Sequence, residues 1–151
     1  NAKLCESNET GMFVTAWMGM LDITTGRVEF ANAGHNPPLV RHADGSFEFL
    51  KSKPGFILAG MEGMKYRKNE LVLSAGDEIY LYTDGVTEAT NAKNELYGEK
   101  RLVKLLDSLH GLTSEGICRA VKADIDAFVG DAPQFDDITM LYLKYNGGSE
   151  K

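Results

Sequence analysis

The sequence predicts an α+β fold with helices stacked on antiparallel sheet, and two observations support this prediction. The first half of the chain alternates short apolar and β-branched runs with turn-forming residues, a pattern typical of antiparallel strands. The second half changes to helical spacing and then closes with one more strand. Strands, then adjacent helices, then a returning strand is an order typical of α+β domains. No repeat or linker divides the chain, so we expect a single domain over residues 1–151.

Six strands are expected before the helices, at residues 12–21, 27–33, 39–42, 46–50, 66–73 and 78–83. Turn-forming residues 22–26 separate the first two, and the second alternates with period two. Pro37 and Pro38 must end it, because proline has no N–H to donate to a neighbouring strand. Asp44-Gly45 predicts a hairpin, and residues 74–77 join the last two strands.

Two helices and a last strand are expected in the second half. The first helix ends near Gly111. The second has Thr113 or Ser114 as its N-cap, and Gly130 follows its end. The last strand covers residues 138–145. The apolar stripes that predict the helices are Leu102, Leu105, Leu106 and Leu109, then Ile117, Val121, Ile125 and Phe128.

The two ends of the chain differ from its middle. Residues 1–10 resemble the tail of a helix, and the first residue is Asn1, so we expect the sequence to begin inside a longer domain. Residues 146–151 are rich in small polar residues and are expected to form a flexible tail.

Composition excludes several classes of partner. Hydrophobic residues make up 43% and charged residues 25%, as is ordinary for a globular domain. The net charge is −6 with no cluster of Lys and Arg, which argues against nucleic acid or an anionic membrane as partner. The longest apolar stretch, residues 12–21, is too short to span a bilayer. Cys5 and Cys118 lack metal-binding spacing and favour two free thiols in the cytoplasm, although a disulfide stays open.

The first candidate site follows the apolar strand at residues 78–83. This strand delivers Asp84 to its end, and Gly85 lets the backbone turn or approach a ligand closely. A carboxylate held at a strand end suits a hard divalent cation. A plain Asp-Gly turn is the alternative.

The second candidate site precedes the last strand, where Asp136 and Asp137 are adjacent. Two ionised neighbouring carboxylates repel each other unless a cation or hydrogen-bond donors compensate. A solvated loop is the alternative. If neighbouring strands bring Asp84 and Asp136 to the same end of a sheet, the two segments together favour a metal site.

Other residues support less chemistry. His35 lies in the Gly34–Pro38 turn, where it could donate a proton or bind a metal, or only hydrogen-bond its own loop. The sequence has no glycine-rich phosphate loop and no Gly-x-Ser-x-Gly motif. Neither cysteine has an obvious His partner, so covalent catalysis lacks support.

Five motifs in order now identify a family. They are Gly11-Met-Phe-Val-Thr15, Asn32-Ala-Gly-His-Asn-Pro-Pro38, Leu81-Tyr-Thr-Asp-Gly-Val-Thr-Glu-Ala89, Tyr97-Gly98 and Asp136-Asp-Ile-Thr139. The chain resembles the SpoIIE/RsbU branch of the metal-dependent (type 2C-like, PPM) serine/threonine protein phosphatases, from about Gly11 to Tyr145.

The resemblance implies an α-β-β-α sandwich with a binuclear Mn²⁺ or Mg²⁺ centre. Asp84 and Asp136 match metal ligands of that family, while Glu88 and Asp137 match positions to which we assign supporting roles. The implied reaction is hydrolysis of phosphoserine or phosphothreonine by a metal-activated water. The implied partner is a phosphorylated anti-sigma-factor antagonist, a small STAS domain.

One departure from the family is expected to matter. The family's opening Gly-Asp-x-x-Gly-His-Gly-like segment, whose Asp bridges the metals, has no counterpart in these residues. We therefore expect this chain alone to be inactive, because two carboxylates do not complete the centre. We also expect an uncovered sheet edge or face that favours self-association. A non-catalytic, phosphatase-like binding module in a partner-switching pathway is the alternative function.

Overall fold

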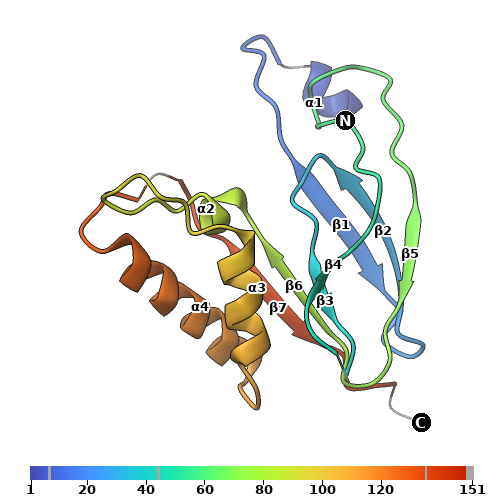
Figure 1. Ribbon diagram of the computed structural model, residues 1–151. Helices are drawn as coiled ribbons and strands as arrows, with labels where there is room; N and C mark the ends of the chain where they lie inside the picture. The colour runs from blue at the N-terminus through green and yellow to red at the C-terminus, as the bar shows by residue number, and fades with distance from the viewer. Residues whose placement is uncertain (7, 44, 135, 149–151) are drawn as a thin grey trace.

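The computed structural model describes residues 1–6, 8–43, 45–134 and 136–148, which form two antiparallel sheets and four helices (Figure 1). One sheet has the order β1-β2-β5, with β1 at Ala16–Leu21, β2 at Arg27–Ala33 and β5 at Asn69–Val72. The other has the order β4-β3-β6-β7, with β3 at Leu39–Arg41, β4 at Glu48–Phe49, β6 at Glu78–Tyr82 and β7 at Met140–Lys144. The helices are α1 (Ala2–Glu6), α2 (Asp84–Thr87), α3 (Glu99–Ser108) and α4 (Ser114–Val129).

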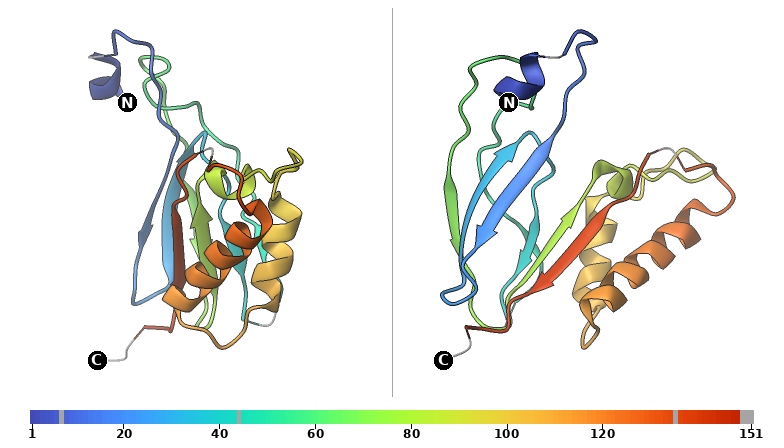
Figure 2. Two further views of the ribbon diagram at one scale, coloured as in Figure 1. Left: turned by 90° about the vertical axis from the view of Figure 1, so that its left-hand side faces the viewer. Right: turned by 180° about the vertical axis from the view of Figure 1, so that it is seen from behind.

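The helices α3 and α4 cover the outer face of the four-stranded sheet (Figure 2). Thr113 is the N-cap of α4, where its side chain accepts a hydrogen bond from the N–H of Gly116 at 3.1 Å. Gly130 ends α4 with φ of 60°, a conformation that glycine adopts without strain. The two predicted helices are therefore confirmed, although α3 ends at Ser108 rather than near Gly111, because the backbone is already extended at Leu109.

Alternation along β6 divides the interior into two cores. Tyr80 and Tyr82 point toward α3 and α4, while Ile79 points between the two sheets. The first core also holds Leu102, Leu106, Ile117, Val121 and Ile125 from the predicted helical stripes. Among the described residues no helix covers the outer face of the three-stranded sheet, and α1 lies beyond its end (Figures 1 and 2). The described part of the expected α-β-β-α sandwich is thus its β-β-α portion.

Several strands are shorter than predicted, because a strand continues only while it has a partner. β1 starts at Ala16 rather than at residue 12. The antiparallel ladder of β1 with β2 ends at the pair Ala16–Ala33, because β2 then turns at Gly34 with φ of 72°. β5 starts at Asn69 rather than at residue 66, because the carbonyl of Asn32 already accepts a bond from Gly55 at 2.7 Å. β4 and β7 are also trimmed relative to residues 46–50 and 138–145, and β3 and β6 each end one residue before residues 42 and 83.

The hairpin of β3 and β4 is confirmed by the pairs Leu39–Phe49 and Val40–Glu48, while Asp44 itself lies outside the described residues. The successive strands β5 and β6, however, belong to different sheets. Residues 74–77 therefore cross from one sheet to the other. Asp77 is buried in this crossover, where its carboxylate accepts bonds from the N–H groups of Ser74 and Ala43, both at 3.0 Å, and pairs with His42 Nδ1 at 2.7 Å.

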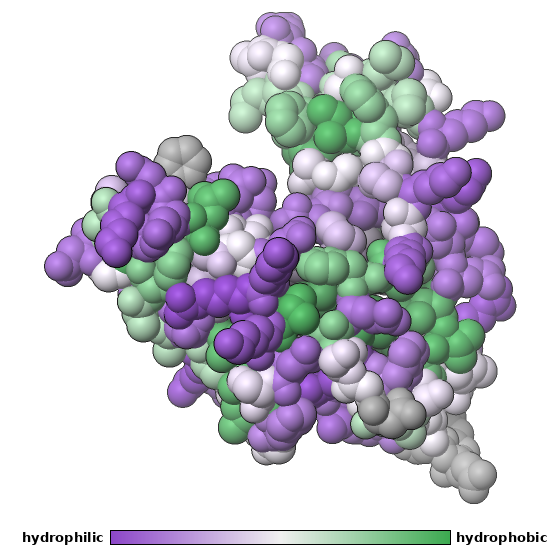
Figure 3. All heavy atoms as spheres, viewed as in Figure 1, coloured by the Kyte–Doolittle hydropathy of each residue, from purple (hydrophilic) through white to green (hydrophobic). Residues whose placement is uncertain are grey.

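Near the N-terminus, α1 and the loop of residues 51–66 form a lobe beyond the sheets on which apolar side chains gather (Figure 3). Asn1 ties α1 to this loop through Met61 and Ala59, and Val14 pairs with Leu58. The segment at residues 12–14 therefore contacts the loop instead of extending β1. Residues 146–148 have no regular structure, and the rest of the expected tail lies outside the described residues.

The structure also tests the predictions about a membrane span and about the two cysteines. Within the described ranges no helix combines the length and apolar character needed to cross a bilayer. Cys5 and Cys118 are both free thiols, so no disulfide joins them.

Candidate metal centre

Asp84 lies where β6 ends, at the start of the one-turn helix α2 (Asp84–Thr87). It is exposed, and its Oδ1 accepts a bond from the N–H of Gly85 at 3.0 Å. The backbone of α2 is itself buried from Gly85 to Thr87. The predicted turn is thus a short helix, which holds the Asp84 backbone in a helical conformation.

Asp136 and Asp137 lie just before β7, which pairs with β6 from Tyr82–Met140 to Glu78–Lys144. Both side chains are exposed. The Oδ1 atom of Asp136 accepts a bond from the N–H of Asp137 at 2.7 Å. Because β6 ends where β7 begins in this antiparallel pair, the segments of Asp84 and Asp136 meet at one end of the sheet, as the sequence interpretation required.

Thr83 and Gly85 join these two segments. The Thr83 hydroxyl donates to the carbonyl of Asp137 at 2.9 Å and accepts from the N–H of Thr139 at 3.0 Å. A Cβ atom added to Gly85 would lie 2.4 Å from the Asp137 carbonyl oxygen, closer than real Cβ atoms come. Glycine at position 85 is thus needed for the close approach of the Asp137 backbone, whereas the sequence interpretation assigned it to a turn or to the close approach of a ligand.

Glu88 ends α2 and donates its N–H to the carbonyl of Asp84 at 2.8 Å. Its exposed side chain lines a pocket of about 210 Å³ together with Gly85 and Asp136. The apolar wall of this pocket comes from α4 and the loop after it, including Ile125, Val129 and Pro133. Glu88 is therefore beside the candidate centre, as a supporting residue must be.

His35 has a local role in the loop between β2 and β3. Its Nδ1 is 3.0 Å from the Thr15 hydroxyl, and its backbone makes two hydrogen bonds with the Asn32 side chain, at 2.7 and 2.9 Å. Asn32 is buried. The structure thus gives His35 the loop-stabilising bonds of the alternative interpretation, and none of its described hydrogen bonds reaches Asp84 or Asp136.

The donor atoms at the meeting point are hard carboxylate oxygens, which Mg²⁺ and Mn²⁺ prefer. Each of Asp84 and Asp136 uses Oδ1 for a local backbone bond, and Oδ2 makes no described hydrogen bond. In the part of the chain that the structure describes, no group of three or more His, Cys, Asp or Glu side chains is arranged to hold a metal ion. The residues therefore fit a contribution of two carboxylates to a metal site.

The sequence interpretation missed Thr83. The only local signal was a threonine directly before a possible helix start, a position that usually caps the helix. The Thr83 side chain makes no capping bond to α2, because its hydroxyl is used for the bonds to the β7 segment.

Tyr82 precedes Thr83 at the end of β6. Its burial, and after it the Glu99 carboxylate, raise the pKa of Tyr82 to about 12, so this phenol stays neutral at physiological pH.

Sequence comparison places the chain among known proteins. The sequence pattern of the family described as Stage II sporulation protein E (SpoIIE) matches residues 1–146. Protein IcfG of Synechocystis is 31% identical over 141 residues, which cover 93% of this chain and 22% of IcfG. Phosphoserine phosphatase RsbU of Bacillus subtilis is 27% identical over 150 residues, which cover 94% of this chain and 42% of RsbU. The chain thus spans less than half the length of these curated relatives.

Several solved structures resemble this chain in fold. The RsbU and RsbW domains of a Mycobacterium tuberculosis protein match with a TM-score of 0.74 at 25% identity, over 99% of this chain and 41% of that one. The phosphatase domain of Bacillus subtilis SpoIIE matches with a TM-score of 0.68 at 14% identity, over 91% of this chain and 60% of that one. A further structure describes the SpoIIE domain as a PP2C phosphatase domain. This chain therefore has part of the PP2C-type fold, and it belongs to the SpoIIE family.

Proposed function

We propose that this chain is part of a metal-dependent protein serine/threonine phosphatase, and that Asp84 and Asp136 are metal ligands. The observation that carries the proposal is the meeting of two aspartate segments at one end of the β6–β7 pair, joined by Thr83. Membership of the SpoIIE family supports it, as does the similarity to a phosphoserine phosphatase.

Asp84 and Asp136 would hold Mn²⁺ or Mg²⁺, the metals named for two other proteins of similar fold. When bound, such an ion lowers the pKa of a bound water and neutralises charge on a phosphate group. The contribution of this chain is to hold the two aspartates in position. β6, α2 and β7 fix the two carboxylate segments, and both aspartate side chains are exposed to solvent. Gly85 leaves room at the meeting point, and Glu88 and Asp137 add negative charge nearby.

The substrate is proposed to be a phosphoserine or phosphothreonine on a regulatory protein, specifically a phosphorylated anti-sigma-factor antagonist. The similarity to RsbU and to a protein with RsbU and RsbW domains supports a place in such a partner-switching pathway. The two free thiols fit a reducing compartment, so the proposal places the protein in the cytoplasm.

The 151 residues alone are proposed to be inactive. Divalent cations take six or more oxygen ligands, and two aspartates with bound water do not fix a pair of ions for in-line attack. Activity would then require carboxylates from a longer natural form of the protein.

The test is Mn²⁺-dependent release of phosphate from a phosphoserine protein, measured for this chain and for its longer natural form. In the longer form we expect Asp84→Asn and Asp136→Asn each to lower kcat at least about 100-fold, because a lost metal ligand weakens transition-state stabilisation. Asp131→Asn is the matched control, since it removes the same charge from the exposed loop before Asp136 and should change kcat less than about two-fold.

Three outcomes separate the alternatives. Turnover by the longer form together with loss in both variants supports the phosphatase. A longer form that binds Mn²⁺ and a partner protein but releases no phosphate indicates a non-catalytic binding module instead. Full turnover by the 151 residues alone contradicts the proposed incompleteness.

A further inference from the structure

Thr83 occupies an unusual position for its side chain. It is the N-cap residue of α2 with extended φ and ψ of −87° and 160°, so its hydroxyl could bond an N–H of the first turn. Such a bond is absent from the described contacts, and the hydroxyl instead reaches across to a segment more than fifty residues away. The Thr83 hydroxyl therefore makes a tertiary contact instead of capping α2.

The tertiary contact uses both hydrogen-bonding roles of the hydroxyl. It donates to the Asp137 carbonyl at 2.9 Å and accepts from the Thr139 N–H at 3.0 Å. The backbone of Thr83 adds one more bond, from its N–H to the Thr139 carbonyl at 3.0 Å. Regular pairing of β6 with β7 has already ended at Tyr82–Met140. Thr83 therefore extends the connection one step beyond the ladder, to the residues beside Asp136.

Gly85 makes the approach possible from the other side. Its missing Cβ leaves the Asp137 carbonyl only 2.4 Å from where that atom would stand, and Gly85 is buried. The two residues that flank Asp84 thus both contact the segment that carries Asp136 and Asp137. One fixes the segment by hydrogen bonds and the other by close packing.

We infer that Thr83 is a positioning residue that sets the Asp136–Asp137 segment relative to Asp84, and that Gly85 permits the same approach. The inference has two parts. The first is that Thr83 orders the segment in the metal-free protein, and the second, which rests on the proposed function, is that this order is needed for the two aspartates to bind a metal ion together.

The first test compares backbone order by ¹⁵N relaxation in the metal-free 151-residue chain. Thr83→Val keeps the shape of the side chain but removes both hydrogen bonds, so order parameters at Asp137 and Ile138 should fall from about 0.85 toward about 0.6. Thr83→Ser keeps the hydroxyl and should restore them. Thr139→Val is the matched control, because it makes the same substitution in the segment that Thr83 bonds and keeps the N–H that donates to Thr83.

The second test is a Mn²⁺ titration of the same four proteins, followed by paramagnetic broadening of the Gly85 and Asp137 amide signals. Loss of the Thr83 hydroxyl should raise the Kd for Mn²⁺ about five-fold or more, a typical effect of losing a hydrogen bond in an ordered site. Thr83→Ser and Thr139→Val should keep the Kd within about two-fold of wild type.

The outcomes distinguish the two parts. Unchanged order parameters in Thr83→Val overturn the positioning role, whatever the metal does. Loss of order without a change in Kd overturns the link to the metal. A wild-type chain whose Gly85 and Asp137 signals never broaden contradicts the proposed metal ligands, while the relaxation data still decide the positioning role. If Thr83→Val loses the signals of α4 and is unfolded, Thr83→Ala gives the same comparison, because it also removes both hydrogen bonds of the hydroxyl and leaves no larger group to accommodate.

Discussion

At the scale of residues, the hydroxyl group of Tyr80 has no hydrogen-bond partner among the described residues, although the side chain is fully buried. Burial, and after it the nearby Cys118, raise the pKa of Tyr80 far above its ordinary value. Tyr97 lies in the same core but donates its hydroxyl to Asp124 at 2.7 Å. The two tyrosines therefore differ in whether their buried polar group is satisfied.

We expect Tyr80→Phe to leave the free energy of unfolding unchanged or to raise it by about 1 kcal/mol, because the substitution removes an unsatisfied buried group. Tyr97→Phe is the matched control and should lower it by about 1–2 kcal/mol, because it removes a bond to a charged acceptor. Urea unfolding followed by circular dichroism measures both. A clear loss of stability in Tyr80→Phe contradicts the interpretation of that hydroxyl.

At the scale of elements, the crossover between β5 and β6 depends on Asp77. This carboxylate bonds the crossover itself through Ser74 and the end of β3 through His42 and Ala43. Burial alone would raise the pKa of Asp77, but the bonds from Ser74, His42 and Ala43 together lower it below the usual 3.8. The two sheets are thus connected at this end by an ionised, buried side chain.

We expect Asp77→Asn to lower the free energy of unfolding by about 2 kcal/mol at pH 7, because an amide cannot accept all of these bonds. Asp131→Asn, on an exposed loop, is the control and should change it by less than about 0.5 kcal/mol. Urea titrations of the three proteins measure the differences. Equal stability of Asp77→Asn and wild type would show that the carboxylate is not needed for the crossover.

The lowered pKa of Asp77 predicts how the free energy of unfolding depends on pH. Because the folded pKa of Asp77 is depressed, its stabilisation is complete above the unfolded pKa of about 4 and is lost as pH falls through the lower folded value. Unfolding midpoints should therefore fall more steeply below about pH 4 in wild type than in Asp77→Asn, which lacks the titrating group. Parallel midpoints in the two proteins from pH 5 to pH 2 would contradict this role.

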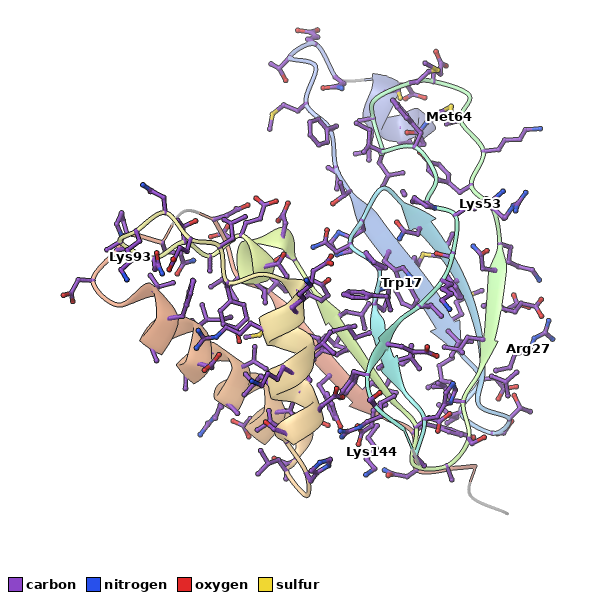
Figure 4. All side chains as sticks on the ribbon, viewed as in Figure 1. Trp17, Arg27, Lys53, Met64, Lys93 and Lys144 are labelled. Atoms are coloured by element: carbon purple, nitrogen blue, oxygen red, sulfur yellow. The ribbon has the colours of Figure 1, made fainter. Side chains whose placement is uncertain are left out.

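At the scale of the whole molecule, the two sheets leave an apolar cleft along one side. It has a volume of about 360 Å³ and is lined by residues of β1, β2, β6 and β7, including Trp17, Leu81 and Leu141. Trp17 points from β1 into the space between the sheets, and its ring stacks on Phe30 at 5.4 Å (Figure 4). Among the described residues β1 and β7 each pair on one side only, so both edges beside the cleft remain open.

We expect the 151-residue chain to self-associate as its concentration rises, because open strand edges and exposed apolar surface favour pairing with another copy. Leu141→Lys should weaken this association at least about ten-fold in Kd, since Leu141 lines the cleft and is 53% exposed. Leu112→Lys is the matched control, because it makes the same substitution at a 48% exposed position between α3 and α4, outside the cleft and away from the strand edges. Sedimentation velocity measures the association, and a wild-type chain that stays monomeric at high concentration contradicts the expectation.

The types of most elements could be predicted from the sequence because they depend on local patterns, whereas α2 was expected to be a turn. Leu102, Leu105 and Leu106 share one face of α3, Thr113 caps the next helix, and Gly130 ends it. The positions of Asp84 and Asp136 at adjoining strand ends followed from the same patterns together with the order of the family motifs. Such signals act over a few residues, so no knowledge of the packing was needed.

Only the tertiary structure decided where strands stop, which sheet each one joins and what Thr83 binds. β1 begins at Ala16 because its partner turns away at Gly34, and β5 and β6 separate into two sheets although only five residues join them. The Thr83 hydroxyl bonds a segment 54 residues further along the chain. A backbone group pairs with whichever group the packing brings within about 3 Å, and the local sequence does not specify a partner that distant in the chain.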